Sequence, residues 1–453
     1  MRCVWLVCGL LMLAVTSCKD DLLYTDGEPI PEGETTIIAQ VDFRPLVEGL
    51  AGKSRTAGDA IKSIQDLCVL LYDTEGNFVE GHSLESISNA NPTDGQFYVN
   101  EVTRKDGDAP DGGTIAETKT PQANLKLTIP YGRYYIYAVA NMGEDFKKAV
   151  QAHGKENGAA EEVAKYKTAI ATKEGLKSIS LTWDVADVAK NSQMFGHFTI
   201  VGQENNSELI TINKKGMKLH SWIRRAASKV TIAYDGSKLE EGVFIYLKSV
   251  TIKDIPQNCC LGQDNPAVPE NYQPKDRDEG VKLDLIKNGE TIKYYEGDTE
   301  PTISDFKETY EARITKGKPL FGSKEQGENA YHPKKLADVH TEITNALYFY
   351  ENMQGKGKEG TPSDKRQVVA NTLNKTEPTY PNGGQENNEA WKDAKPYGTY
   401  IEVDAFYVSI NDKKVGRGPI KYRFMLGKDV ITDYNAERNH HYKLTFEVQG
   451  ICQ

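Results

Sequence analysis

The sequence predicts a mostly β protein built from β-sandwich domains, with one or two short helices and long loop insertions. Apolar and more polar residues alternate in short runs, as in Thr35 to Phe43 and Tyr442 to Val448. This period of two gives a strand one buried and one wetter face. Clusters of Gly, Pro, Asn and Asp separate the runs and predict turns. Only residues 156–173, rich in Ala, Glu and Lys, favour a helix. Many short strands with few helices are typical of sandwiches.

The first residues predict a secretory leader rather than part of the fold. The apolar run from Val4 to Val15 has 12 residues, which is too short to span a bilayer as a helix but suits the core of a signal peptide. The run leads into the sequence VTSC, which ends at Cys18 and resembles the lipobox of bacterial lipoproteins. We therefore expect residues 1–17 to be a lipoprotein signal peptide and Cys18 to carry the lipid. The alternative is an ordinary signal peptide with a coincidental cysteine.

Residues 18–34 are polar, contain Gly and Pro, and predict a flexible tether. Lys19-Asp20-Asp21 resembles the charged signal that sends lipoproteins of Bacteroidetes to the outer face of the outer membrane, although a solvated tether would look the same. No other segment is apolar over the roughly 18 residues that a membrane span needs. We expect a surface-exposed outer membrane lipoprotein held by the lipid on Cys18.

The N-terminal sandwich domain is expected over residues 35–210. A Gly-containing loop at 46–60 separates its first strand from the strongly apolar run Ile64 to Tyr72, which predicts a central strand. The inward positions of the first strand are Ile37, Ala39, Val41 and Phe43. Further strands are expected near 78–79, 97–99, 125–129, 134–141, 178–183 and 196–201.

The C-terminal sandwich domain is expected over residues 211–453. Two polar segments, 257–340 and 352–398, predict long loop insertions with little core. The strands expected in this domain lie near 217–234, 244–252, 346–350, 400–410, 420–426 and 442–448.

Composition and motifs argue against several classes of function. The formal net charge of −10 repels phosphate backbones, so we expect no nucleic-acid partner. The sequence has no HExxH metal motif, no GxSxG elbow, no phosphate loop and no dinucleotide fingerprint. Adjacent His440 and His441 point to opposite faces of a strand, which is poor for chelation, and Arg438-Asn439 are expected to hydrogen-bond a loop. We therefore expect no catalytic residues, metal or cofactor, although the many carboxylates leave a glycosidase pair open.

The seven cysteines do not form a disulfide-dense scaffold, and no pair has zinc-ligand spacing. Cys68 lies within an apolar strand, where a free thiol acts as a small hydrophobic side chain. Cys259 and Cys260 are adjacent, and a disulfide that involves one of them stays open.

Six features, in their order along the chain, resemble the fimbrillin family, the type V pilins of Bacteroidales. The first is the lipoprotein leader that ends at Cys18. The second is a loop with Ser54-Arg55-Thr56, followed by the apolar strand that runs to a turn at Gly76. The other four are Tyr137 to Asn141 (YAVAN), Arg224 to Val230 (RRAASKV), Ala346 to Gly355 (ALYFYENMQG) and the block from Tyr422 to Tyr442 with YRFMLG, DYN and RNHHY.

The resemblance implies a two-domain pilin with transthyretin-like sandwiches, a structural and adhesive subunit of a cell-surface pilus. In that family an arginine-specific protease cuts the exported lipoprotein in its first loop and so releases the lipid and the first strand. Arg55, followed by Thr56 and flanked by Gly52 and Gly58, is the candidate cleavage site here; the alternative is an ordinary exposed arginine. A strand inserted from a neighbouring pilin subunit would fill the opened groove, and the protein would end in the fimbrium.

The last expected strand bears on the position in the pilus. Only Gln449 to Gln453 follow it, and five residues reach at most about 18 Å. Because such a tail is short for filling a neighbour's groove, we expect a tip or accessory subunit, and the polar insertions would suit a host or glycan ligand. Two alternatives keep the lipid and the first strand: a pilus base anchor and a surface glycan-binding lipoprotein. A secreted hydrolase has no positive evidence beyond size.

Overall fold

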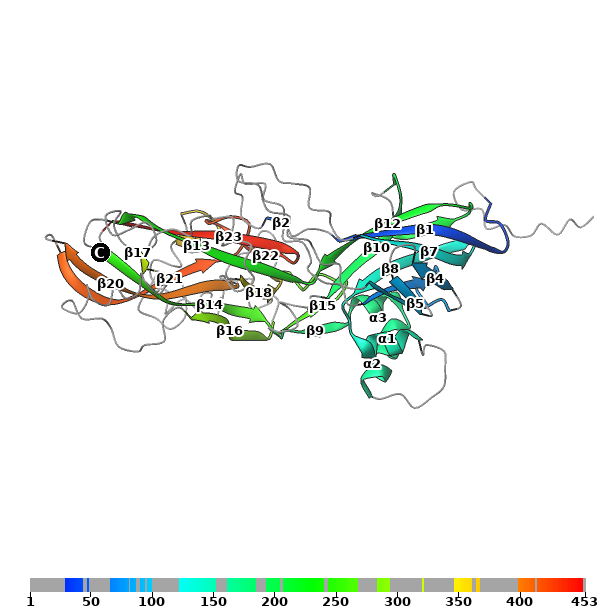
Figure 1. The fold of residues 1–453 in the computed structure, drawn as a ribbon, viewed down its shortest axis with the longest axis horizontal. Coiled ribbons are helices and arrows are strands. Elements are labelled where there is room, and N and C mark those ends of the chain that lie inside the picture. Colours follow the sequence, from blue (N-terminus) through cyan, green and yellow to red (C-terminus); the bar gives the residue numbers. More distant parts are fainter. Residues whose placement is uncertain are drawn as a thin grey trace, which may run out of the picture.

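The computed structural model shows an elongated, mostly β protein, in which two sets of sheets lie end to end (Figure 1). The mostly β class is as predicted. The structure describes residues 29–43, 47–48, 66–80, 82–86, 90–93, 96–99, 122–151, 161–184, 193–203, 207–239, 243–267, 283–293, 320–321, 346–360, 364–366, 398–411 and 414–450.

Ten strands form the sheet of the N-terminal half, in the order β4-β7-β1-β12-β10-β8-β3-β6-β5, with β11 paired to β8. At one end of this order β4 contacts β5 and β6 from the other end, so the sheet curls round one core. The bounds of its strands are β1 (Glu34–Phe43), β3 (Leu67–Tyr72), β4 (Ser83–Ser86), β5 (Ala90–Thr93), β6 (Gln96–Val99), β7 (Gln122–Pro130), β8 (Gly132–Ala140), β10 (Met194–Ile200), β11 (Leu209–Ile212) and β12 (Lys218–Arg225).

The core of this half draws side chains from strands that lie far apart in the sheet. Ile37 on β1, Leu127 on β7, Val69 on β3 and Ile136 on β8 all belong to one buried cluster. The curled sheet therefore surrounds its core, so that a single sheet supplies both layers of the sandwich. The expected turn between the strands at 125–129 and 134–141 is present, since β7 ends at Pro130 and β8 begins at Gly132.

Three short helices pack on the outer face of β3 and β8. They are α1 (Glu144–Gln151), α2 (Glu161–Ile170) and α3 (Lys173–Lys177). α2 lies within the predicted helix 156–173, whereas α1 and α3 have no counterpart in the prediction. The turn before α1 is fixed by the buried Asp66 carboxylate, which accepts the amides of Met142 and Gly143, each at 2.9 Å. None of the described helices has the length and hydropathy to cross a membrane.

The C-terminal half has two sheets face to face. One has the order β18-β13-β23-β2 and the other β16-β14-β20-β21, with β17 paired to β14. Val230 and Phe349 from the first sheet pack against Val250 and Val403 from the second. The bounds are β2 (Val47–Glu48), β13 (Ala227–Leu239), β14 (Val243–Pro256), β16 (Leu285–Lys293), β17 (Leu320–Phe321), β18 (Ala346–Tyr350), β20 (Tyr400–Asn411), β21 (Lys414–Met425) and β23 (His440–Gly450).

A mixed apolar cluster and a short ladder join the two halves. β9 (Ser180–Thr182) from the first half pairs with β15 (Asn258–Cys260) from the second, and Tyr137 shares a buried cluster with Tyr350. A further pair, β19 (Asn352–Lys356) and β22 (Asp433–Ala436), lies in the second half.

The change from the first sheet to the second falls at Ala226, between β12 and β13, whereas the predicted domains meet at residues 210 and 211. β12 and β13 follow each other with one residue between them, so the apolar pattern over 217–234 runs through the change without a break. No turn-rich linker lies between the two strands in this described stretch.

Candidate functional site

The first strand, β1, lies inside its sheet although it comes first along the chain. It pairs antiparallel with β7 from Glu34 to Asp42 and parallel with β12 from Ile38 to Phe43. In Figure 1 it is the dark blue strand between the labels β12 and β7. We call the space that β1 fills between β7 and β12 the β1 slot.

The inner face of β1 is fully buried where the structure describes its side chains. Ile37, Ala39 and Val41 are each 0 % exposed and belong to the core of the N-terminal half. This agrees with the alternation in the sequence, while removal of the strand stays a prediction. The backbone of Phe43 pairs with Ile223, but its side chain lies outside the described residues. Burying Ile37 and Val41 alone stabilises the strand by roughly 3–6 kcal/mol.

The fit of β1 in its slot is incomplete in two places. The hydroxyl oxygens of Thr35 and Ser221 are buried and have no hydrogen-bond partner among the described residues. Ser221 lies on β12 at the level of Val41, so its hydroxyl meets an apolar neighbour on β1. A buried polar group without a partner costs about 1–3 kcal/mol. The slot thus holds β1 by apolar burial and backbone pairing, and two buried hydroxyl groups beside these contacts lack a hydrogen-bond partner among the described residues.

The outer face of β1 carries the polar contacts. His220 Nε2 lies 2.7 Å from Asp42 Oδ2, and Gln40 donates to the same carboxylate oxygen at 2.9 Å. Near the start of the strand, the Thr36 and Thr128 hydroxyls are 3.2 Å apart. These contacts tie β1 to β12 and β7 from the solvent side.

The segment after β1 reaches the other half of the molecule. β2 pairs in parallel with β23, with Val47 opposite His440 and Glu48 opposite His441, and forms the edge of that sheet. The predicted lipidation site Cys18 and the predicted cleavage site Arg55-Thr56 lie outside the described residues. A cut after Arg55 would therefore release a segment that holds both β1 and β2.

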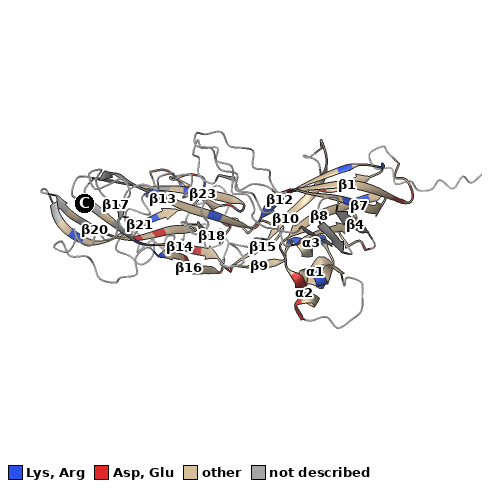
Figure 2. Ribbon diagram, in the orientation of Figure 1, with Lys and Arg blue, Asp and Glu red and all other residues tan. Residues whose placement is uncertain are grey.

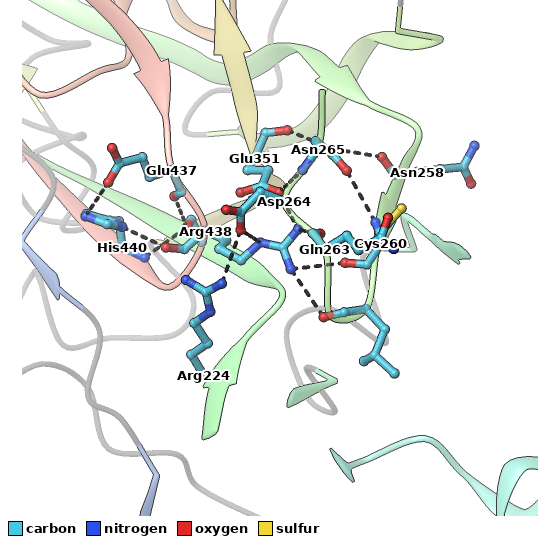
Figure 3. Close-up of polar contacts among 12 residues, drawn as sticks. Arg224, Asn258, Cys260, Gln263, Asp264, Asn265, Glu351, Glu437, Arg438 and His440 are labelled. Carbon is cyan, nitrogen blue, oxygen red and sulfur yellow. Dashed lines mark hydrogen bonds and ion pairs between the residues drawn. The ribbon is translucent and has the colours of Figure 1, made fainter. Parts of the chain in front are cut away.

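A second site, a buried polar network around Arg438, lies where the two halves meet (Figure 3). The guanidinium donates to the backbone carbonyls of Cys260 at 3.0 Å, Leu261 at 3.2 Å and Gln263 at 2.6 Å, and it pairs with the Glu351 carboxylate. Both side chains are nearly inaccessible, at 4 % and 3 %. Burial alone would lower the pKa of Arg438, but the hydrogen bond to Glu351 raises it. Arg438 thus holds a loop, as the sequence suggested.

Glu351 and Asn265 complete the hold on that loop. The Asn265 amide donates to Glu351 Oε1 at 2.5 Å, and its side-chain amide donates to the carbonyls of Asn258 at 3.3 Å and Glu351 at 3.1 Å. Asn265 Oδ1 in turn accepts the amide of Cys260 at 3.3 Å. The network that we call the Arg438 clamp consists of Arg438, Glu351, Asn265 and the loop 258–265.

The wall of the β1 slot ends at this clamp. Arg224, near the end of β12, donates to Asp264 at 3.1 Å, and the Arg225 amide donates to Asn439 Oδ1 at 3.1 Å. Asn439 has a positive φ of 54°, a conformation that Asn tolerates better than most residues. The sequence analysis singled out Arg224 and Arg225 by resemblance alone; the structure makes them the link between slot and clamp.

The cysteines and the histidine pair in the described part of the chain make structural contacts. Cys68, Cys259 and Cys260 are free, so neither adjacent cysteine forms the disulfide that the sequence left open. Burial raises the pKa of the Cys259 thiol, which makes it unreactive. His440 Nδ1 lies 2.7 Å from the Arg438 carbonyl, whereas His441 Nε2 lies 2.8 Å from the Thr231 hydroxyl. No group of three or more metal-ligating side chains gathers among the described residues.

Comparison with protein families gives one match. Residues 347–446, less than half of the chain, match a family described as a domain of unknown function, DUF4906. No curated protein sequence matches the chain.

Comparison with solved structures gives likenesses over most of the chain at low identity. A candidate cell adhesion protein from Parabacteroides distasonis has a TM-score of 0.41 at 11 % identity, over 92 % of this chain and 89 % of that one. A candidate cell adhesion protein from Bacteroides eggerthii has 0.37 at 12 %, over 94 % and 89 %. The tip fimbrial protein Mfa3 from Porphyromonas gingivalis has 0.36 at 11 %, over 93 % and 96 %. Each of these three TM-scores is below 0.5.

Proposed function

We propose that this chain is a structural and adhesive subunit of a cell-surface pilus, at its tip or as an accessory subunit, and that β1 is a plug which a strand of another pilin subunit replaces. The observation that carries the proposal is the position of β1, which is the first described strand yet is paired on both sides. Its two neighbours, β7 and β12, do not pair with each other in the described sheet. Loss of β1 would therefore leave two open strand edges above an apolar floor, which binds extended peptides strongly.

The proposed pathway uses three predicted features in turn. The chain is exported and tethered to the outer membrane by the lipid on Cys18. An arginine-specific protease then cuts after Arg55, and the released piece takes β1, β2 and the lipid with it. The mature chain begins at Thr56 and joins the fimbrium through the opened slot.

The kind of contact that holds β1 supports exchange. Ile37, Ala39 and Val41 contribute apolar burial, and the ladders to β7 and β12 use only backbone groups. A different strand with the same alternation would restore both. The unmet hydroxyls of Thr35 and Ser221 leave room for a replacing strand to bind better than the plug.

The test begins with cleavage of the whole protein by an arginine-specific protease and mass spectrometry of the products. We expect a mature chain that starts at Thr56, and no such product from the Arg55→Ala variant. The cut protein is then mixed with a fluorescent peptide of residues 34–43. We expect the peptide to bind the cut protein and not the uncut one, with an Ile37→Asp, Val41→Asp peptide as the matched control.

Two results would contradict the proposal. One is a protein cut at Arg55 that takes up the native and the doubly substituted peptide equally. The other is surface material from cells that keeps a lipidated Cys18 and an intact β1 while pili assemble normally.

A second candidate is a surface glycan-binding lipoprotein that keeps its lipid and β1. A hollow of about 600 Å³ at the ends of β8, β10 and β11 favours it, because its lining is rich in polar side chains. Those polar residues are Arg133, Thr199, Gln203, Ser207 and Thr211. Oligosaccharide binding to the uncut protein that Gln203→Ala abolishes would support this function; undiminished binding by the variant would remove it.

A further inference from the structure

We propose that the β1 slot selects the replacing strand by charge and size, favouring Asp or Glu at the level of Ile38 and a small residue at the level of Ala39. This inference rests on the proposed exchange of β1 and specifies its partner. The partner is an extended segment of a different chain, with an acidic residue between two apolar inward positions. The first strand of a second copy would bring isoleucine to that level instead.

The charge is concentrated at one level of the slot. Ile38 lies opposite Lys126 on β7 and opposite Lys218 on β12. No other lysine or arginine occurs among the residues paired with β1 in the two ladders. All three side chains point to the solvent face, where Ile38 is 42 % exposed. Basic residues, blue in Figure 2, lie on the strands beside β1.

A carboxylate at this level would lie between two ammonium groups. Directly opposite residues on neighbouring strands have their Cβ atoms about 4.5–5.5 Å apart, and the lysine stems are long enough for both to reach one carboxylate. The neighbouring outward levels differ in chemistry, since Thr36 faces Thr128, and Gln40 faces His220 and Asn124. Among the residues paired with β1, only the level of Ile38 has a lysine on both sides, and Lys126 also lies opposite Glu85 on β4.

The size requirement comes from the next, inward level. Ala39 lies opposite Leu125 on β7 and opposite Leu219 on β12, and all three are buried. A larger side chain there would crowd two leucines that already fill the core, and overpacking of this kind is destabilising. The two requirements also fix the register, because a shift by two residues would move the acid away from the lysines and bring a large residue to the level of Ala39.

The same geometry explains why the resident strand can be displaced. Isoleucine at position 38 gains little from burial, since it is nearly half exposed, and cannot form an ion pair with either flanking lysine. An acidic strand keeps the inward contacts of Ile37 and Val41 and adds two ion pairs across the strands. The resident plug is thus the weaker of the two ligands for its own slot.

The first test uses the whole protein after cleavage at Arg55 and peptides of residues 34–43. We expect the Ile38→Glu peptide to bind about three- to tenfold more tightly than the native peptide, and the Ile38→Lys peptide to bind more weakly than either. The preference for Glu should shrink in high salt. An Ala39→Leu peptide should bind roughly tenfold more weakly than the native one.

Charge reversal in the slot supplies the matched control. In a Lys126→Glu, Lys218→Glu protein the preference should invert, so that the Ile38→Lys peptide binds more tightly than the Ile38→Glu peptide. Equal affinity of the Ile38→Glu and Ile38→Lys peptides for the wild-type slot would overturn selection by charge. If both peptides bound with that equal affinity, the proposed exchange of β1 would still hold.

A second measurement separates this inference from the exchange itself. In the uncut chain, the melting temperature of Ile38→Glu should be about 2–4 °C higher than that of Ile38→Lys. The melting temperatures of Thr36→Glu and Thr36→Lys should be equal. Equal melting of the two variants at position 38 would overturn the inference, whatever the peptides do. The expected difference at position 38, combined with no uptake of any peptide by the cut protein, would instead overturn strand exchange and with it the proposed partner.

Discussion

β1 and β23 hold similar places in the two halves of the molecule, and they differ in how they are held. β1 runs parallel to β12 and β23 runs parallel to β13, the two strands that follow each other at Ala226. β1 has an additional long ladder with β7, whereas among the described residues β23 has only the two-residue pairing with β2 on its other side. By backbone pairing alone, β1 would be the more firmly fixed strand.

Side-chain contacts reverse that order. The Arg438 clamp lies directly before β23 in the chain. At the start of β23, the Ser228 hydroxyl donates to the Glu437 carbonyl at 2.5 Å and accepts the His440 amide at 2.9 Å. The buried Tyr442 hydroxyl accepts the Glu437 amide at 2.8 Å. β1 has the contact of Asp42 with His220 on its outer face, but among the described residues it has no comparable set on its inner face, where apolar side chains meet an apolar core.

The comparison separates contacts that any strand can reproduce from contacts that need particular residues. Apolar burial and backbone ladders are contacts that any strand of the right alternation can reproduce, so they hold a strand without fixing its identity. Buried polar contacts demand particular residues at particular places and are costly to leave half-made. A plug can therefore be tightly bound and still exchangeable.

The largest effect should come from breaking the clamp. Arg438→Ala leaves the buried Glu351 carboxylate without its cation and three loop carbonyls without a donor, so we expect a loss of about 3–5 kcal/mol in the free energy of unfolding. Denaturant titration of the uncut protein measures this. The double variant Arg438→Met, Glu351→Leu should recover a large part of the loss, because it removes both buried charges. A loss below about 1 kcal/mol for Arg438→Ala would mean that the clamp does not fix β23.

Truncating the plug should come next. Ile37→Ala removes a fully buried side chain of β1, and we expect a loss of about 2–4 kcal/mol in the uncut protein. Ile38→Ala, one position along the same strand but half exposed, is the matched control and should change stability by less than about 0.5 kcal/mol. After cleavage at Arg55 and removal of the released segment, Ile37→Ala should have no effect. A persistent effect in the cut protein would mean that β1 does not leave the slot.

The buried face of β1 could be predicted from the sequence more fully than the partners of Arg438, and the reason is physical. Alternation in residues 35–43 is a local signal, and it identified the buried Ile37, Ala39 and Val41. The partners of Arg438 come from the loop 258–265, 175 to 178 residues away, and from Glu351, 87 residues away. Nothing local shows that these distant residues meet, so only a hydrogen bond from Arg438 to a loop could be predicted.

The helices and the change of sheet show the same limit. α1 and α3 are short, with 8 and 5 residues, and helices of this length are marginal on their own. They are stabilised by packing against β3 and β8 and, for α3, by the Thr172 cap. The sequence of β12 and β13 forms one apolar run because both strands carry side chains that are buried in the core of their own half. Which sheet a strand joins depends on contacts with the rest of the chain.

Acid should weaken the second half through one buried carboxylate. Burial alone would raise the pKa of Glu402, but hydrogen bonds from Lys421, Lys253 and Arg423 lower it to about 2. A lowered pKa stabilises the folded state above the ordinary value near 4.5, and this contribution is lost as pH falls from about 4.5 towards 2. We expect Glu402 to contribute about 2 kcal/mol at pH 6.

Denaturant titrations of the wild type and Glu402→Gln at pH 6 and pH 2.5 measure that contribution. The two proteins should differ at pH 6 and converge at pH 2.5. Peptide exchange in the β1 slot has no such carboxylate on its inner face and should not follow the same pH dependence. A constant difference between the two proteins across this range would show that the charge of Glu402 is not what stabilises the sheet.

The smallest effect should come from Arg224, which links the slot wall to the clamp at the surface. Its ion pair with Asp264 joins side chains that are 42 % and 68 % exposed, and exposed pairs contribute little because water and salt screen them. We expect Arg224→Ala to change the free energy of unfolding by less than about 0.5 kcal/mol, as measured by the titration used for Arg438→Ala. A loss approaching that of Arg438→Ala would mean that the slot and the clamp act as one unit, and that removing β1 would disturb the hold on β23.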